Sequence, residues 1–365
     1  MNRMDQQFEL IKLTTRMATP EDSHIPAYDH TKLSNINTCP TWGILRYSMH
    51  KKMPGSSRSM ALEAGASAHE AFSAVRWYQF HRSVIDKTGA AIAENHGIKL
   101  FGADRFQQMK DKLSPNATDR TNCINFALEA LYSCGFYDDI KDTKRTTSNI
   151  SESIIAYIND YDFDRFPLWV RDPTDRDTDI GIEIGFNIVV TITYSMNNMQ
   201  YTKQSRLTGR LDGLHTFTDT ANKGKLLIIE EKTVSRLDDS WLSQWILSHQ
   251  ITGYCLASAT FTGLPCNHAL VSGMRIPIGR IPHEGIRKEM VPRNNHMFEK
   301  WANWFVTTVE IEEQWRDQVT KAPMYTHSCN RYFSSCSFLS FCAADEEEKE
   351  IILEEMETDE WNPLH

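Results

Sequence analysis

The sequence predicts an α/β fold, in which a β-sheet core is flanked by helices. The apolar residues have helical spacing in the first half of the chain, and beyond Pro173 they change to the alternation that is typical of strands. Four apolar residues, Leu226 to Ile229, lead directly into a charged segment, as expected of a buried strand with polar residues at its end. The 365 residues are enough for one large domain or for two.

The predicted strands are short apolar runs that are separated by polar or glycine-containing turns. The turn from Asp219 to Gly224 is polar and ends in Lys-Gly, which predicts a hairpin between the runs on either side of it. We expect strands at residues 180–193, 205–216, 225–233, 268–276 and 285–291.

Helices are predicted on both sides of these strands in the sequence. Residues from about 100 to 165 read as a helical subdomain inserted before the sheet. A short helix capped by Ser34 would end at Cys39, after an extended or partly ordered lead-in over residues 1–30. The longer predicted helices are residues 59–80, 119–133, 148–161, 239–258 and 294–315.

The charge of the chain is unevenly distributed. A formal net charge of −9 at first argues against a nucleic-acid partner. The segment 345–360 holds ten acidic residues and one lysine, a sum of −9, so the rest of the chain is formally neutral and local basic patches remain open. The N-terminal sequence has no apolar stretch of the length that a signal peptide or membrane span needs, so we expect a soluble, cytoplasmic protein with no membrane partner.

The predicted hairpin from Gly209 to Lys232 carries the first candidate site. It would bring Asp212 close to Glu230 and Lys232, with Glu231 on the opposite face of its strand. Carboxylates bind hard divalent cations, and a lysine beside them can position or activate a water, which outlines a hydrolytic site. Taken alone, the same residues also fit two solvent-facing strand ends with ordinary surface charges.

Two predicted helices carry further candidates. On the helix at 59–80, Gly65, His69 and Phe72 share a face of mostly small residues. A lone histidine there fits an ordinary core or surface residue, but a neutral imidazole also ligates metals. On the helix at 239–258, Gln250 and Tyr254 share a face with Ser243 and Leu247, which fits either a packed helix with solvated tips or residues that serve a site.

The eight cysteines fall into a scattered set and a C-terminal group. In a reducing compartment they are not expected to form a disulfide framework. Cys329, Cys336 and Cys342 lie within fourteen residues, and the polar residues between them indicate a loop rather than a packed core. A fourth ligand from elsewhere, such as Cys39 next to Pro40, would complete a site for zinc or for an iron–sulfur cluster.

In their order along the chain these motifs resemble the RecB-type nucleases of the PD-(D/E)XK superfamily. The likeness is nearest to the branch with an iron–sulfur cluster, which includes CRISPR-associated RecB-like exonucleases, the AddB nuclease domain and phage exonucleases. The motifs that carry it are Cys39-Pro40, Gly65-x3-His69, Gly209-Arg-Leu-Asp212, Glu230-Glu231-Lys232, Gln250-x3-Tyr254 and the C-terminal cysteine triplet.

The resemblance implies a restriction-endonuclease-like core with a central mixed sheet, and roles for the candidate residues. It implies that His69, Asp212, Glu230 and the backbone carbonyl of Glu231 bind Mg²⁺ or Mn²⁺. It also implies that Lys232 orients or activates the attacking water, while two further residues steady the lysine and the DNA backbone. These two residues are Gln250 and Tyr254.

The resemblance also implies a [4Fe–4S] cluster on four cysteines. These are Cys39, Cys329, Cys336 and Cys342. The family spacing of the triplet is C-x2-C-x5-C, whereas this chain has C-x6-C-x5-C, so the loop after Cys329 is longer and zinc stays the alternative. The implied organisation is a lead-in at 1–33, a nuclease domain at 34–342 with a helical insertion at about 75–175 and a cysteine-cluster region at its C-terminal end, and an acidic tail at 343–365.

The function that the resemblance implies is a metal-dependent DNA exonuclease. It would act on single-stranded ends with 5′ to 3′ preference, and recombination or replication proteins would be its partners. A DNA-binding recombination or repair accessory protein with a degenerate nuclease fold is the alternative. The intact Asp212, Glu230 and Lys232 favour the enzyme.

Overall fold

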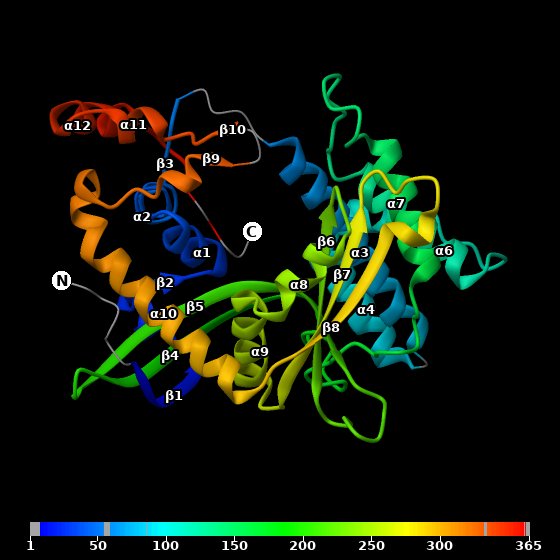
Figure 1. Cartoon of the computed structure of the whole chain (residues 1–365). Coiled ribbons are helices and arrows are strands. Elements are labelled where there is room, and N and C mark those ends of the chain that lie inside the picture. Colours follow the sequence, from blue (N-terminus) through cyan, green and yellow to red (C-terminus); the bar gives the residue numbers. More distant parts are fainter. Residues whose placement is uncertain (1–7, 55–58, 85, 332–333, 361, 363–365) are drawn as a thin grey trace. The chain divides into compact units, whose positions relative to one another are not determined.

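The computed structural model of the chain has an α/β architecture, as the sequence predicts (Figure 1). It describes residues 8–54, 59–84, 86–331, 334–360 and 362. The start of the expected lead-in and the end of the acidic tail therefore lie outside the described residues. The chain divides into two compact units: unit 1 is Met1–Ser57, Phe186–Gly209 and Asn295–His365, and unit 2 is Arg58–Gly185 and Arg210–Asn294.

A mixed sheet of seven strands is the centre of the fold. Six strands follow one another in the order β1-β4-β5-β6-β7-β8, and the short β2 (Ala27–Tyr28) pairs with β5. All five predicted strands are present in this sheet, but β5 begins earlier than expected. The bounds of the six are β1 (Glu9–Met17), β4 (Ile182–Met196), β5 (Met199–Thr216), β6 (Leu226–Val234), β7 (Cys266–Arg275) and β8 (Ile286–Pro292).

The pairing of β5 with β6 is antiparallel, from Thr216 opposite Leu226 to Gly213 opposite Ile229. The predicted hairpin is therefore confirmed. Strand β7 pairs with β6 in parallel, which requires a crossover between them, and two helices supply it. They are α8 (Asp239–Ile246) and α9 (His249–Thr262).

Helices of unit 2 build a large apolar core beside the sheet. The long α3 (Met60–Ser83) crosses this core with Phe72 and Trp77 buried, and Met274 of β7 joins it. In Figure 1 the labels α4, α6 and α7 lie to the right of β6 and β7, and α9 lies on the other side of these strands. The remaining helices of this group are α4 (Lys87–Phe101), α5 (Ala103–Lys110), α6 (Asp119–Tyr132) and α7 (Thr147–Asp160).

Unit 1 has a smaller core that joins distant parts of the sequence. Ile36 and Leu45 from the N-terminal region pack with Phe338, Phe341 and Met356 from the C-terminal region. The helices around it are α1 (His30–Thr38), α2 (Pro40–Gly43), α10 (Asn295–Trp315), α11 (Leu339–Ala343) and α12 (Glu346–Glu355). The acidic tail is thus helical over α12.

Some local predictions are wrong. Ser34 does not cap the first helix, because α1 begins four residues earlier and the side chain of Asp29 accepts a hydrogen bond from the Lys32 N–H. The expected lead-in contains β1, which pairs antiparallel with β4.

None of the helices in the described part of the chain is long and apolar enough to cross a membrane.

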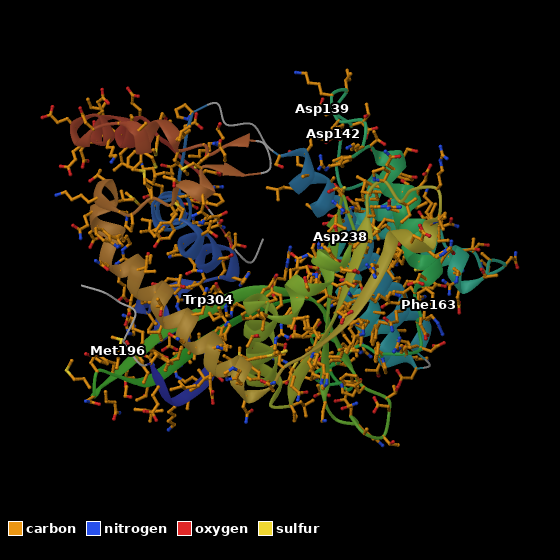
Figure 2. All side chains as sticks on the ribbon, viewed as in Figure 1. Asp139, Asp142, Phe163, Met196, Asp238 and Trp304 are labelled. Atoms are coloured by element: carbon orange, nitrogen blue, oxygen red, sulfur yellow. The ribbon has the colours of Figure 1, made fainter. Side chains whose placement is uncertain are left out.

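The helix predicted at 239–258 is two helices. The helix α8 is capped by Asp238, which Figure 2 labels, and it ends at Ile246. A new N-terminus follows because the side chain of Ser248 accepts a hydrogen bond from the Ile251 N–H and starts α9. Ser243 and Leu247 therefore do not share a helix face with Gln250 and Tyr254, which lie together on α9.

Candidate metal centre

The hairpin of β5 and β6 places two carboxylates side by side. Gly213 and Ile229 form the last pair of the antiparallel ladder. Asp212 directly precedes Gly213, and Glu230 directly follows Ile229. Asp212 is fixed further, because its Oδ2 accepts a hydrogen bond from the Glu231 N–H at 3.0 Å. The strand pairing therefore delivers both acids to one end of the hairpin.

Helix α3 and strand β4 complete a group of metal-ligating side chains around Asp212. The Nδ1 atom of His69 lies 3.6 Å from Asp212 Oδ1. Glu183 joins them, and the three side chains each offer one ligand atom, all within 4.8 Å of one another. Within the described residues this is the one group of three or more His, Cys, Asp or Glu that comes so close. Two carboxylates and an imidazole suit Mn²⁺ or Mg²⁺.

Sequence reasoning missed Glu183. It lies at the start of β4 with φ +50°, a left-handed conformation that costs on the order of 1–3 kcal/mol for a residue with a side chain. The residues around it, Gly-Ile-Glu-Ile-Gly, are otherwise apolar or glycine. A single acid within such a run was the available signal, because an acid on a mostly buried strand is rarely found without a partner or a role.

The predicted residues on β6 and α9 form a second, connected group. The Nζ atom of Lys232 lies 2.5 Å from Glu230 Oε1, and the Gln250 side-chain amide donates to the same oxygen at 3.1 Å. That amide also lies 3.0 Å from the Tyr254 hydroxyl, to which it donates. The alternation of the strand puts Glu230 and Lys232 on one face, as predicted. Gln250 binds Glu230, the acid that pairs with the lysine, and Tyr254 binds Gln250.

Glu230 has one carboxylate oxygen that the lysine and the glutamine leave unsatisfied. Its side chain is 1% exposed, and no hydrogen-bond partner for its Oε2 is found among the described residues. A buried carboxylate oxygen without a partner is costly, and a metal ion would satisfy it. Lys232 keeps 29% of its side chain exposed, so the site is open to solvent.

The electrostatics of the two groups follow from burial and from crowded negative charge. Burial, followed by the charge of Asp212, raises the pKa of Glu183 and the pKa of Glu230 to about 7 each. Burial lowers the pKa of His69, which favours the neutral imidazole that ligates metals. Burial would also lower the pKa of Lys232, but Glu230 and Asp212 outweigh it and the pKa is raised, so Lys232 is an ammonium.

Glu231 faces away from these groups. Its carboxylate pairs with the Arg76 guanidinium and accepts a hydrogen bond from the Tyr157 hydroxyl at 2.9 Å. Its backbone N–H is bonded to Asp212, so the main chain of Glu231 lies at the site while its side chain lies in the core.

The four predicted cluster cysteines gather within unit 1. Cys39 lies at the junction of α1 and α2, and Cys342 lies in α11. The backbone N–H of Cys336 donates to the Cys329 carbonyl at 2.8 Å. Burial, followed by the charges of Cys39, Cys336 and Cys329, raises the pKa of Cys342 to about 11, so the four cysteines lie near one another. Thiolates are ligands of zinc and of iron–sulfur clusters, but within the described residues no three of these cysteines bring their sulfur atoms as close together as the group at Asp212.

Together the two groups at the hairpin offer hard ligands, an ammonium and an unsatisfied buried oxygen, and the side chains of His69 and Lys232 are partly exposed to solvent. This combination can bind a divalent cation and act on an anionic substrate. No protein-family model matches the chain, and no curated protein matches it.

Proposed function

We propose that this chain is a metal-dependent deoxyribonuclease that hydrolyses phosphodiester bonds at the ends of single-stranded DNA. The observation that carries the proposal is the convergence of His69, Glu183 and Asp212, with ligand atoms within 4.8 Å of one another. The ion pair of Lys232 with Glu230 on the paired strand supports it. These are the residue types that the resemblance to RecB-type nucleases requires, and Glu183 adds a further acid.

The ligand set fits Mg²⁺ or Mn²⁺. His69, Glu183 and Asp212 would hold the ion, and the free Oε2 of Glu230 would add an oxygen. Such an ion supplies Lewis acidity, since it lowers the pKa of a water and offsets negative charge on the phosphate. Mg²⁺ and Ca²⁺ prefer sites in which every ligand is an oxygen, so the imidazole among these ligands favours Mn²⁺.

The chain's own residues then have separate tasks. The ammonium of Lys232 donates hydrogen bonds to the attacking water or to a phosphate oxygen, and Glu230 keeps it in place. Gln250 fixes the rotamer of Glu230, and Tyr254 accepts from Gln250. Exposed Arg210, whose Nε lies 3.0 Å from Glu183 Oε2, provides a further cation beside the site for an anionic substrate.

The test is degradation of labelled single-stranded DNA with Mn²⁺ or Mg²⁺ by the wild-type chain and by Lys232→Ala. Cleavage should disappear in the variant, while its thermal unfolding stays that of a folded protein. Full activity in the variant would refute the assigned site. DNA binding without cleavage under either metal would instead favour the recombination or repair accessory protein.

The direction and the mode of cleavage need their own substrates. The resemblance implies an exonuclease with 5′ to 3′ preference, which is expected to leave covalently closed single-stranded circles intact. Strands labelled at either end give the direction, because the 5′ label should be released first. Cleavage of the circles would show endonuclease activity.

For the cysteine group we propose a [4Fe–4S] cluster. Its ligands would be Cys39, Cys329, Cys336 and Cys342, whose thiols lie in one region of unit 1. Each would bind as thiolate, the form that a metal stabilises. Protein purified without oxygen should be brown with broad visible absorption, whereas a colourless protein with one equivalent of zinc would refute iron at this site.

A further inference from the structure

Arg76 is a buried cation directly behind the candidate metal centre. It lies on α3, seven residues or two helical turns after His69, and its side chain is 1% exposed. A guanidinium is almost never buried unless its charge is paired. The burial of the Arg76 charge therefore requires acidic partners around it.

Two acids from different strands surround the guanidinium. Glu231 of β6 forms a direct ion pair with it, and Glu183 Oε1 of β4 lies 4.0 Å from its Nη1. The Ser73 hydroxyl, one turn earlier on α3, donates to the same Glu183 oxygen at 2.8 Å. Ser73 and Arg76 of α3 thus lie next to the carboxylate of Glu183, and His69 of the same helix lies close to it as well.

Strand β5 is shaped to admit this arginine. A Cβ atom at Gly213 would lie 2.7 Å from Arg76 Nε, closer than real Cβ contacts come, and 3.0 Å from His215 Nε2, which is a tight contact. Glycine is therefore needed at the residue after Asp212, because the guanidinium lies against the backbone there. The Gly-Arg-Leu-Asp-Gly sequence accordingly ends in a residue that serves Arg76.

We propose that Arg76 is a positioning residue of the metal centre, which fixes the Glu183 carboxylate toward His69 and Asp212 and holds the Glu231 side chain away from them. This inference rests on the proposed function. A fixed buried cation lets several carboxylates stay close together before a metal arrives, since like charges otherwise repel. The planar guanidinium can contact two carboxylates from two strands at once, which a lysine ammonium does less well.

The simpler role is that Arg76 only neutralises the buried Glu231. Removing one partner of a buried ion pair is strongly destabilising, so Arg76→Met alone is expected to fold poorly under either role. The double variant Arg76→Met, Glu231→Gln removes both charges and separates the two roles. Its folding should recover, but Glu183 would still lack its cation.

The experiment is calorimetric titration of Mn²⁺ into the full chain without DNA, with thermal unfolding as the check on folding. The double variant should bind Mn²⁺ about 10–100-fold more weakly than the wild type, the usual effect of losing a residue that orients a ligand. Glu183→Gln should weaken binding similarly, and combining it with the double variant should add little. Wild-type affinity in the folded double variant would overturn the proposal.

Arg76→Lys gives a second test if the double variant does not fold. It keeps the charge but loses the planar fork, so it should fold and still bind Mn²⁺ more weakly than the wild type. Unchanged affinity in Arg76→Lys would also overturn the proposal. Tyr157→Phe is the matched control, because it removes a buried hydrogen bond to Glu231 only, and its Mn²⁺ affinity should be that of the wild type. If the wild type itself binds no Mn²⁺, the proposed function fails rather than the role of Arg76.

Discussion

Acidification should destabilise the chain through His215, a fully buried histidine on β5, the strand that also carries Asp212. Its Nδ1 lies 2.8 Å from the Phe166 carbonyl, so this nitrogen carries the hydrogen, and no partner for its Nε2 is found among the described residues. Burial lowers the pKa of His215 from 6.5 to about 3. The folded state therefore keeps this ring neutral at pH values at which the unfolded chain binds a proton.

The size of the effect follows from proton linkage. The folded pKa is the lower one, so the stabilisation is present above pH 6.5 and is lost as the pH falls toward 3. One pKa unit corresponds to about 1.4 kcal/mol, so His215 alone should lower the free energy of unfolding by about 2 kcal/mol between pH 7.5 and pH 5. Protonation at Nε2 would place a second positive charge beside Arg76, so the guanidinium also lowers the pKa of His215.

The assay is urea unfolding of the wild type and of His215→Gln at pH 7.5 and at pH 5. The glutamine amide can still donate toward the Phe166 carbonyl, but it does not titrate. Other histidines, such as His96, contribute equally to both proteins and cancel in the difference. The variant should lose about 2 kcal/mol less than the wild type on acidification. Equal losses in both proteins would refute the reasoning.

Further predictions separate the acids, the tyrosine and the cysteines. Glu230→Gln should abolish DNA cleavage and leave the free energy of unfolding nearly unchanged. Glu231→Gln should lower the free energy of unfolding by about 3–5 kcal/mol, because Arg76 loses its charge partner. Urea unfolding and nuclease assays on both variants would show the reverse pattern if the two glutamates had each other's roles. Tyr254→Phe removes one acceptor from Gln250, so cleavage should fall by less than about tenfold, the value of one neutral hydrogen bond, and a total loss would assign the hydroxyl a direct role. Cys336→Ser should abolish the visible absorption of anaerobically purified protein, while serine at the buried Cys255 of α9 should not.

The sequence predicted the parts of the site that depend on local spacing. The hairpin places Asp212 next to Glu230 because strand pairing and a polar turn set its register. The spacing Gln250-x3-Tyr254 puts both side chains on one helix face, and the Gln250 amide indeed donates to Tyr254 and Glu230. The hairpin register and the contact of Gln250 with Tyr254 are set by local sequence, whereas the contact of Gln250 with Glu230 needs α9 to pack beside β6.

The parts that the sequence did not predict depend on contacts between distant segments. Glu183 and Arg76 each look like one charged residue in an apolar run, and their roles exist only once β4, β5 and α3 are packed together. The helix break before α9 was missed because neither glycine nor proline marks it, and Ser248 reads as an ordinary helical residue until its capping bond is seen. Strand β1 was missed because its pairing with β4 joins residues that are far apart in the sequence.

The most direct test of the proposed metal centre is Mn²⁺-dependent release of nucleotides from single-stranded DNA by the wild type and by Asp212→Asn. Asp212 contacts both His69 and the backbone of Glu231, so its charge is central to the site, while asparagine preserves its shape. The account predicts release by the wild type that requires the metal and none by the variant. Release at the wild-type rate by Asp212→Asn would contradict it.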